Sequence, residues 1–390
     1  MQQVQCSRCR ADVPEAAHYC QVCGLDTHTD DGARRASYAA KPNESVVSLK
    51  LVSTIMPRGA AIRPMTYQFA LGLALLVTVI AAASGALPIA VLIAAFAMPI
   101  VYIVYLYDVN LWEDEPLLVT GLAFLLTAVL GGAWTWLWLS WQAPATPSAE
   151  WSGTLPAPTL TGFLIVAVLA PVVGEAIRQL GPVVLASRPE FDDLMDGLTF
   201  GVISGVAFAT ADTLVKHWPL ITGGYAGPSD APTWISLLVL EGFVKPLVMG
   251  TATGIACAEY SGLGDGYDGF TPRYYRGLAE AVGANVLYAG GSYLLGFLAS
   301  PVLGLVLSML WGLAILAVLV LRIRTALHRG LMEAALESTA RARGVGPALE
   351  FCPSCEMPLL PGARFCSNCG VSVLATAKVP MRVPSEEEQA

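Results

Sequence analysis

The chain has 390 residues, of which 55% are hydrophobic and only 13% are charged. A soluble domain usually carries about 25% charged residues, so most of this chain is expected to lie in lipid or against other apolar helices. The net charge of −8 excludes a broad basic surface for phosphate groups, and nucleic-acid binding is therefore not expected.

The chain begins with a cysteine-rich module, CSRCRADVPEAAHYCQVCG at residues 6–24, in which ten residues separate two CxxC pairs. Two thiolates from each pair complete a closed tetrahedral set that suits zinc and leaves no position for a substrate. About twenty residues cannot bury a core, so the metal must supply the folding free energy. Redox dithiols or free thiols are the alternatives. A polar, flexible linker is expected over residues 27–64.

Eight apolar runs follow, each close to the roughly 20 residues that a helix needs to cross a bilayer. An even number of crossings places both termini on one side of the membrane. The expected spans are Met65–Ala83, Pro88–Tyr107, Pro116–Trp138, Leu160–Ala186, Leu198–Val215, Trp234–Ala258, Gly277–Ala299 and Val302–Leu321.

The basic residues indicate which side faces the cytoplasm, because cytoplasmic loops carry an excess of lysine and arginine. Arg58 and Arg63 precede the first span, and Arg322 and Arg324 follow the last one, whereas the proline-rich loop 142–158 has no lysine or arginine. The sequence therefore predicts a multi-pass protein of the cell membrane with both termini in the cytoplasm.

After the last span, a charged helical stalk is expected over residues 322–348, then a second cysteine module, CPSCEMPLLPGARFCSNCG at residues 352–370, and a disordered tail over 373–390. Paired CxxC motifs favour metal binding in a reducing compartment over disulfides. Cys257 stands alone in an apolar run and is interpreted as a packing residue. The predicted ligands of two structural zinc ions are Cys6, Cys9, Cys20, Cys23, Cys352, Cys355, Cys366 and Cys369.

Both modules resemble the short zinc ribbons found at the ends of many prokaryotic membrane proteins, most clearly in the phrase FCSNCG. The expected domain organisation is an N-terminal zinc ribbon at 1–26, the linker, a transmembrane domain at 65–321, the stalk and a C-terminal zinc ribbon at 349–372. The predicted fold class is therefore an all-α polytopic membrane protein of about eight transmembrane helices, flanked by two small zinc ribbons.

Strongly polar side chains inside the apolar runs are functional candidates, because a charge at the centre of a membrane helix costs about 2.5–3.5 kcal/mol on insertion scales. Depths counted at 1.5 Å per helical residue place four of them, Glu175, Lys245, Asp212 and Asn285, about 12–21 Å from the cytoplasmic ends of their helices. These side chains are expected to meet in one layer. The complete set is Glu175, Arg178, Asp212, Glu241, Lys245 and Asn285.

Two spacings add to this expectation. Glu241 and Lys245 are four residues apart on one helix face and can pair with each other. Gly197, Gly201 and Gly205 recur every four residues, which lets a neighbouring helix approach closely and brings Asp212 near a facing backbone.

Residues from about 100 to 300 resemble the PrsW family of intramembrane proteases, which are relatives of the CAAX-processing membrane proteases. Three stretches carry the resemblance. YLYDVNLWEDEP contains Asp108 and Glu115-Pro116 and is similar to the family's entry to a span; PVVGEAIRQLG is similar to its EExxK motif; EFDDLMDGLTFGVISGVAFATAD is similar to its aspartate-glycine stretch followed by FxxxE. The resemblance implies Glu175, Asp212 and Asn285 as the catalytic positions.

The chain departs from the family at the residues that carry the chemistry. Gly174 stands at the first glutamate of the pair, Arg178 at the lysine and Asp212 at the FxxxE glutamate. The family's later histidines would fall near Pro246 and at Asn285. A metal-dependent hydrolase needs ligands such as neutral imidazoles together with a carboxylate base. His217 lies at the outer end of the fifth span, beyond Asp212, and is not well placed to complete such a site.

These departures predict a catalytically impaired relative that binds membrane segments of client proteins and docks cytoplasmic proteins through its zinc ribbons. Glu175 and Arg178 are then expected in an ion-pair and hydrogen-bond cluster with Asp212, Lys245 and Asn285. Two alternatives remain open. One is an active intramembrane endopeptidase, which would hydrolyse a membrane peptide, and the other is a small-solute or ion transporter, which would show charge-dependent flux.

Overall fold

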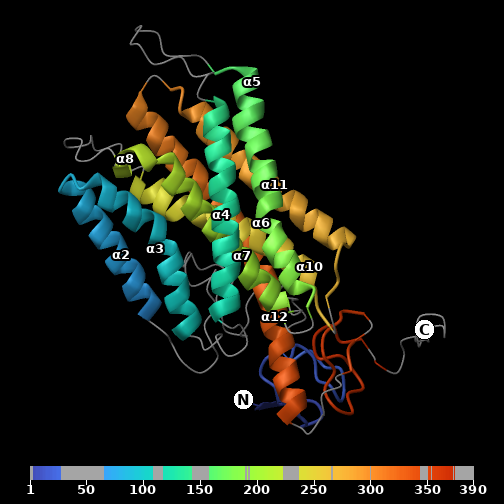
Figure 1. The fold of residues 1–390 in the computed structure, drawn as a ribbon. Coiled ribbons are helices and arrows are strands. Elements are labelled where there is room, and N and C mark those ends of the chain that lie inside the picture. The colour runs from blue at the N-terminus through green and yellow to red at the C-terminus, as the bar shows by residue number, and fades with distance from the viewer. Residues whose placement is uncertain are drawn as a thin grey trace. The chain divides into compact units, whose positions relative to one another are not determined.

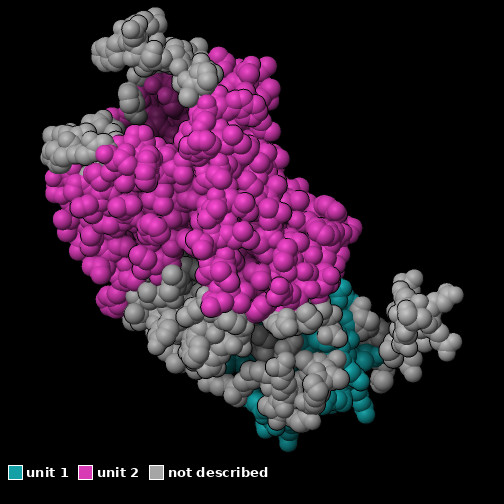
Figure 2. Space-filling view, in the orientation of Figure 1, with its two compact units in different colours: residues 1–47, 263–265, 328–390 teal, residues 48–262, 266–327 magenta. Residues whose placement is uncertain are grey.

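The computed structural model describes residues 3–27, 66–108, 117–142, 158–188, 191, 194–222, 237–264, 267–298, 300–342, 350–352, 354–371 and 373. The predicted linker beyond residue 27, Glu115, Pro116 and the predicted tail beyond residue 373 lie outside these ranges. The chain divides into two compact units, shown in Figure 2. Unit 1 is Met1–Val47, Leu263–Asp265 and His328–Ala390, and unit 2 is Ser48–Gly262 and Gly266–Leu327.

Unit 2 is a bundle of helices (Figure 1). Helical segments cover the described part of every predicted span, except residues 296–298 at the end of the seventh. The elements are α2 (Thr66–Ala83), α3 (Leu87–Asp108), α4 (Leu117–Gln142), α5 (Leu160–Phe163), the π-helical segment η1 (Leu164–Leu169), α6 (Ala170–Ala186), α7 (Leu194–Lys216), α8 (Trp218–Thr222), the π-helical segment η2 (Leu237–Val244), α10 (Lys245–Ser261), α11 (Pro272–Leu295) and α12 (Pro301–Ala342). The part of α12 from His328 onward belongs to unit 1.

Four segments of these helices are long and apolar enough to cross a membrane, and two further apolar stretches, in α2 and α3, are shorter. The four are Leu118–Trp141, Leu160–Ala186, Leu194–Lys216 and Val302–Ala326 among the described residues. The chain is therefore a helical membrane protein, and the number of eight crossings stays a prediction. The expected stalk is helical as far as residue 342, and it continues the helix of the last span without a break.

Helix α7 is the centre of the bundle and contacts α3, α4, α6 and α10. Its closest neighbour is α10, and the glycine stripe faces that helix. A Cβ atom added at Gly201 would lie 2.7 Å from the Cα of Gly254, and one added at Gly205 would lie 2.6 Å from the backbone nitrogen of Gly250. Only glycine permits such an approach of two backbones. The close approach expected from the sequence is therefore made with α10.

Helices α6 and α10, which pack against α7 and carry the polar residues, each follow a π-helical segment, whose turns are wider than those of an α-helix. Segment η1 precedes α6, and Pro171 is at the start of that helix; segment η2 precedes α10, and Pro246 is at its start. Proline removes a backbone donor and its ring collides with the carbonyl four residues earlier, so the preceding turn widens. The π-helical segment therefore ends shortly before Glu175 in α6 and directly before Lys245 in α10.

Unit 1 contains both cysteine modules. In the first, β1 (Gln3–Gln5) pairs antiparallel with β2 (Asp12–Pro14), with Val4 opposite Val13. Each module turns after its first CxxC pair through a residue with positive φ, Arg10 at 60° and Glu356 at 62°. The same backbone bonds close both turns, since Cys6 N–H donates to Ala11 O and Cys352 N–H donates to Met357 O, each at 2.9 Å. The two modules are therefore structural repeats.

Candidate functional sites

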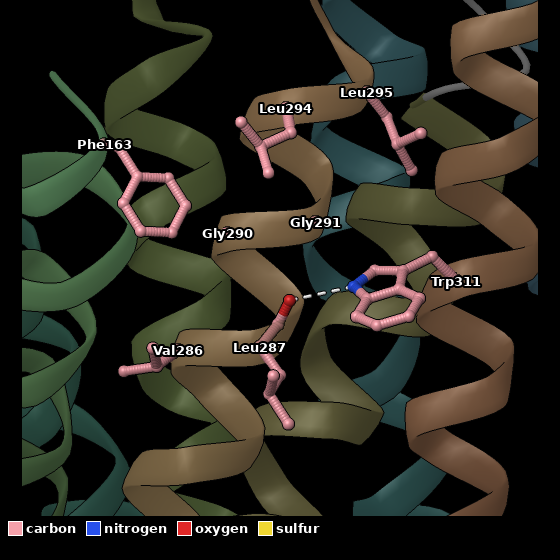
Figure 3. Close-up of a pocket in the computed structure, with 8 residues that line it drawn as sticks. All are labelled: Phe163, Val286, Leu287, Gly290, Gly291, Leu294, Leu295 and Trp311. Atoms are coloured by element: carbon pink, nitrogen blue, oxygen red, sulfur yellow. Dashed lines mark hydrogen bonds between the residues drawn. The ribbon is translucent and has the colours of Figure 1, made fainter. Parts of the chain in front are cut away.

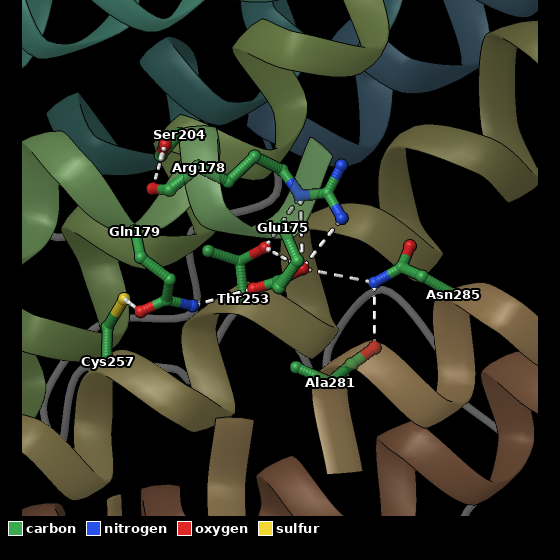
Figure 4. A network of polar contacts seen from close by, with 8 residues as sticks. All are labelled: Glu175, Arg178, Gln179, Ser204, Thr253, Cys257, Ala281 and Asn285. Carbon is green, nitrogen blue, oxygen red and sulfur yellow. Dashed lines mark hydrogen bonds and ion pairs between the residues drawn. The ribbon is translucent and has the colours of Figure 1, made fainter. Parts of the chain in front are cut away.

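Glu175 lies on α6 with none of its surface exposed, and its carboxylate is surrounded by donors (Figure 4). Arg178 Nη2 lies 2.6 Å from Oε2, and its Nε lies 3.2 Å from the same oxygen. Thr253 Oγ1 and Asn285 Nδ2 both donate to Oε2 at 3.2 Å, and Gln179 Nε2 donates to Oε1 at 2.6 Å. Five donor atoms therefore meet a carboxylate that offers about four lone-pair sites.

Three elements build this group of residues, which we call the Glu175 cluster: Glu175, Arg178, Gln179, Thr253 and Asn285. Arg178 and Gln179 follow Glu175 by three and four residues on α6, so the helix itself brings them to the carboxylate. Thr253 comes from α10 and Asn285 from α11. The sequence predicted Glu175, Arg178 and Asn285 as candidates but missed Gln179 and Thr253, although Gln179 had a signal, being a strong polar residue four positions from a buried acid.

The Glu175 cluster is fixed by further bonds around it. Thr253 Oγ1 accepts from Arg178 Nε at 3.1 Å, and Ser204 Oγ on α7 donates to the Arg178 carbonyl at 2.6 Å. The Arg178 guanidinium also lies over the Phe208 ring, 4.8 Å from its centroid. Cys257, interpreted from the sequence as a packing residue, is buried and also donates its thiol to Gln179 Oε1 at 3.3 Å.

A second polar group, which we call the Lys245 cluster, comprises Lys245, Asp212, Glu241, Thr213 and Thr135. The ammonium of Lys245 contacts Asp212 Oδ2 at 2.7 Å, donates to Thr213 Oγ1 at 2.9 Å and pairs with Glu241. Thr135 on α4 donates to Asp212 Oδ1 at 2.8 Å, and Thr213 donates to Glu241 Oε2 at 2.9 Å. The predicted pairing of Glu241 with Lys245 is therefore present.

The prediction of a single charged layer is wrong. Ser204 on α7 contacts the Glu175 cluster and Thr253 on α10 belongs to it, whereas Asp212 and Lys245 lie eight residues away from them on the same two helices. Eight helical residues span about 12 Å along the axis. Asn285 contacts Glu175 as expected, but Asp212 and Lys245 belong to a separate level of the bundle.

Each cluster is close to neutral in formal charge. Glu175 is paired with Arg178. Asp212 and Glu241 are balanced by Lys245 and by Lys216, whose ammonium lies 2.8 Å from Asp212 Oδ2 and is 42% exposed. A buried charge is tolerated when it is paired and hydrogen-bonded. The paired charges therefore account for how these residues can lie within apolar helices.

An apolar groove lies on another face of the bundle (Figure 3), with a cavity volume of about 380 Å³. Trp311 on α12 lies across Gly291 of α11, and its indole nitrogen donates to the Leu287 carbonyl at 2.8 Å. The groove has almost no polar surface, and it is lined by Phe163, Val286, Leu287, Gly290, Gly291, Leu294, Leu295 and Trp311. No pattern in the sequence indicates this groove, because its shape depends on the packing of separate helices.

The cysteine modules have the geometry of closed metal sites. The four sulfur atoms of each lie within 4.8 Å of one another. Sγ–Sγ distances are 3.6 Å for Cys6–Cys23, 3.5 Å for Cys9–Cys20, 3.8 Å for Cys352–Cys369 and 3.5 Å for Cys355–Cys366. A tetrahedral site with Zn–S bonds of about 2.3 Å has sulfur atoms about 3.8 Å apart. Both sites therefore suit zinc, as predicted.

One cysteine of the second site has a lowered pKa. The pKa of Cys355 is lowered to about 5, chiefly by the hydrogen bond from the Cys366 thiol; burial opposes this shift, and a backbone hydrogen bond at Met357 adds to it. The thiolate, and not the thiol, is the metal ligand. Cys355 is therefore ready to bind zinc at neutral pH.

The class of protein follows from these features. Apolar side chains cover the outside of the helices, including Leu122, Leu125 and Val318, each more than half exposed. Soluble proteins rarely show such continuous apolar surface. Together with the two thiolate sites, this surface defines a helical membrane protein with a four-cysteine zinc site in each terminal region.

The comparison with known families names the two domains. Residues 115–257 match the PrsW family of intramembrane metalloproteases, and residues 351–371 match the zinc-ribbon domain. The chain thus contains a PrsW-protease domain and a C-terminal zinc ribbon, as its motifs indicated. No curated protein and no solved structure matches the chain.

The family description implies a metal at the membrane site, and the residues around Glu175 do not fit one. The carboxylate oxygens already accept five donor atoms, and the Arg178 guanidinium at 2.6 Å would repel a cation. His217 lies thirteen residues beyond Ser204, about 20 Å along the axis. Among the described residues, only the two cysteine groups bring three or more metal-binding side chains together.

Proposed function

We propose that this chain is a catalytically impaired, PrsW-like membrane protein that binds membrane segments of client proteins. One observation carries the proposal: both oxygens of the Glu175 carboxylate accept from protein donors, four atoms at Oε2 and one at Oε1, and the side chain is fully buried. A general base must reach the proton that it removes from water or substrate. Glu175 instead serves as the acceptor that holds α6, α10 and α11 together.

The apolar groove of Figure 3 is the proposed client site. In a bilayer, helices associate through close packing of side chains and backbones rather than through the hydrophobic effect. Gly290 and Gly291 lie at the groove and let the Phe163 and Trp311 rings pack against α11, while Leu287 and Leu294 are half exposed or more and can contact the side chains of an apolar helix. In this proposal the protein spans the membrane eight times, both termini face the cytoplasm, and the zinc ribbons connect it to cytoplasmic proteins.

Peptide cleavage tests the impaired state directly. Purified protein and a synthetic single-span peptide are placed in lipid vesicles, and products are measured by mass spectrometry. We expect no product that differs between wild type and Glu175→Gln. A peptide cleaved by wild type and left intact by Glu175→Gln would contradict the proposal.

Binding needs its own measurement, with the same peptide. A photo-crosslinking residue at Leu294, which lines the groove and is 50% exposed, is expected to capture the peptide. The matched control is Leu125 on α4, which is 58% exposed but does not line the groove. Equal capture from both positions would show contact through random collision in the bilayer and would contradict groove binding.

An active intramembrane endopeptidase is the second candidate, and the PrsW match over residues 115–257 favours it. In that case the Glu175 cluster would have to open during turnover, freeing the carboxylate from Arg178. The cleavage experiment distinguishes the two functions, because only an active protease loses product with Glu175→Gln.

A further inference from the structure

The two cysteine modules correspond residue by residue. A shift of 346 positions, the difference between Cys6 and Cys352, superimposes all eight ligands. The same shift relates Tyr19 to Phe365 and Gln21 to Ser367, and it also relates Gly24 to Gly370. The modules are therefore two copies of one fold within unit 1, and their contacts with each other can be compared copy by copy.

The copies contact each other through backbone hydrogen bonds that obey this correspondence. Tyr19 N–H donates to Ser367 O at 2.9 Å, and the equivalent Phe365 N–H donates to Gln21 O at 3.2 Å. The preceding residues repeat the pattern, since His18 N–H donates to Ser367 O and Arg364 N–H donates to Gln21 O, both at 2.9 Å. Each bond thus has a partner bond with the two copies exchanged, which is the signature of a two-fold interface.

The side chains show the same exchange. A Cβ atom added at Gly24 would lie 2.8 Å from the Phe365 ring, and one added at Gly370 would lie 2.9 Å from the Tyr19 ring. Each aromatic ring therefore lies against the glycine that follows the last cysteine of the other copy. Gln21 is 5% exposed and Ser367 is 1% exposed, so the centre of this interface is shielded from water.

We infer that each zinc ribbon is the binding partner of the other, and that the two form a clasp that closes only when both hold zinc. The acceptors Gln21 O and Ser367 O lie between the two cysteines of a CxxC pair, and Gly24 and Gly370 directly follow such pairs. The metal fixes the backbone of these turns, because such small modules bury only a few side chains around their cysteines. Losing zinc from one ribbon therefore removes the acceptor and the glycine surface that the other ribbon binds.

Two consequences follow from the clasp. Both termini must lie in the same compartment, so the chain between them crosses the membrane an even number of times. The paired edge of each ribbon is also unavailable to other proteins while the clasp is closed, so a cytoplasmic partner binds a different face or competes with the partner ribbon.

The test uses the full-length chain with a specific protease site inserted between residues 40 and 45, in the predicted linker. After cleavage in detergent and zinc-containing buffer, the N-terminal fragment should elute with the membrane domain on size exclusion. Tyr19→Ala should weaken retention about tenfold, a change that corresponds to about 1.4 kcal/mol, while the protein still binds two zinc ions. The control Val4→Ala, at a 53% exposed position on β1, should retain the fragment as wild type does.

A second variant separates the zinc requirement from simple adhesion. Cys352→Ser with Cys355→Ser removes only the C-terminal site, and the N-terminal fragment should then elute alone although its own four cysteines are intact. Retention of the fragment in that variant, or its loss from the cleaved wild type, would overturn the clasp. Co-purification of two differently tagged chains that depends on Tyr19 would show that the ribbons pair between copies, which would overturn the intramolecular inference.

Discussion

Lys245 shows how a residue can be held in a membrane helix without taking part in chemistry. It is 3% exposed, and its ammonium contacts two carboxylates and a hydroxyl, which accounts for its three donor protons. Removing one partner of a buried ion pair leaves an uncompensated charge, which costs more than the pair contributes. The loss of Lys245 would therefore leave the Asp212 and Glu241 carboxylates without their buried cation.

Lys245→Met should lower the free energy of unfolding in detergent by about 3–5 kcal/mol, because Asp212 and Glu241 would lose their buried cation. Thermal unfolding measures the loss. Adding Asp212→Asn to this variant should recover part of it, since the two residues are in contact at 2.7 Å. Adding Glu175→Gln should instead lower the free energy of unfolding further, by the same amount as it does alone, because Glu175 lies in the other cluster. Recovery by Glu175→Gln, or wild-type stability of Lys245→Met, would contradict two separate clusters.

The sequence predicted which polar residues matter here but misplaced some of them. Glu175 with Arg178, and Glu241 with Lys245, follow from helical spacing alone and are paired in the structure. The level of Lys245 could not be predicted, because a depth count assumes that helices start at one plane and run parallel. Tilts and axial offsets between helices depend on packing, and they shift a residue by two turns.

At the scale of the element, the contact of α7 with α10 is the tightest feature of the bundle. Gly201 and Gly205 on one helix face Gly254 and Gly250 on the other, and Gly197 faces Ser261 and the Cys257 carbonyl. In lipid, this close packing replaces the hydrophobic effect as the attraction between helices. This contact also positions both polar clusters. Helix α7 supplies Asp212 and the hydrogen bond from Ser204 to the Arg178 carbonyl, and α10 supplies Lys245 and Thr253.

Gly201→Ala should therefore lower the free energy of unfolding by about 1–3 kcal/mol through overpacking. Its new methyl group would lie 2.7 Å from the Gly254 Cα and could move only by separating the helices. The matched control is Gly283→Ala on α11, where an added Cβ meets nothing within 4 Å. That change should be neutral or stabilising, since alanine is more favourable than glycine in a helix by about 1 kcal/mol. Equal melting temperatures for both variants would contradict the proposed packing.

At the scale of the whole molecule, two independent arguments support termini in one compartment: the even number of predicted spans and the clasp. That this compartment is the cytoplasm is predicted from the charge pattern. The sequence could predict that the ends share a compartment, because the apolar runs are even in number. It could not predict that the ends bind each other, since the ribbon interface depends on backbone bonds between segments more than 300 residues apart.

Cysteine labelling in intact cells tests this topology. A thiol introduced by Ser148→Cys, in the loop without basic residues, should react with a membrane-impermeant maleimide added outside. Ser385→Cys, in the predicted C-terminal tail, is the matched position and should react only after the cells are lysed. Labelling of Ser385→Cys in intact cells would contradict cytoplasmic termini.

The metal content of the purified protein tests both kinds of site at once. Two closed thiolate sets should hold two zinc ions per chain, one in each ribbon. Replacing Cys6, Cys9, Cys352 and Cys355 with serine should remove both ions and unfold the ribbons, because binding supplies their folding free energy. The helical content should remain nearly unchanged, since membrane helices satisfy their own backbone hydrogen bonds. Elemental analysis and circular dichroism give the two readouts. A third metal that survives in this variant and is lost on Glu175→Gln would contradict the impaired site, and it would require the Arg178 ion pair to open so that the Glu175 carboxylate can become a ligand.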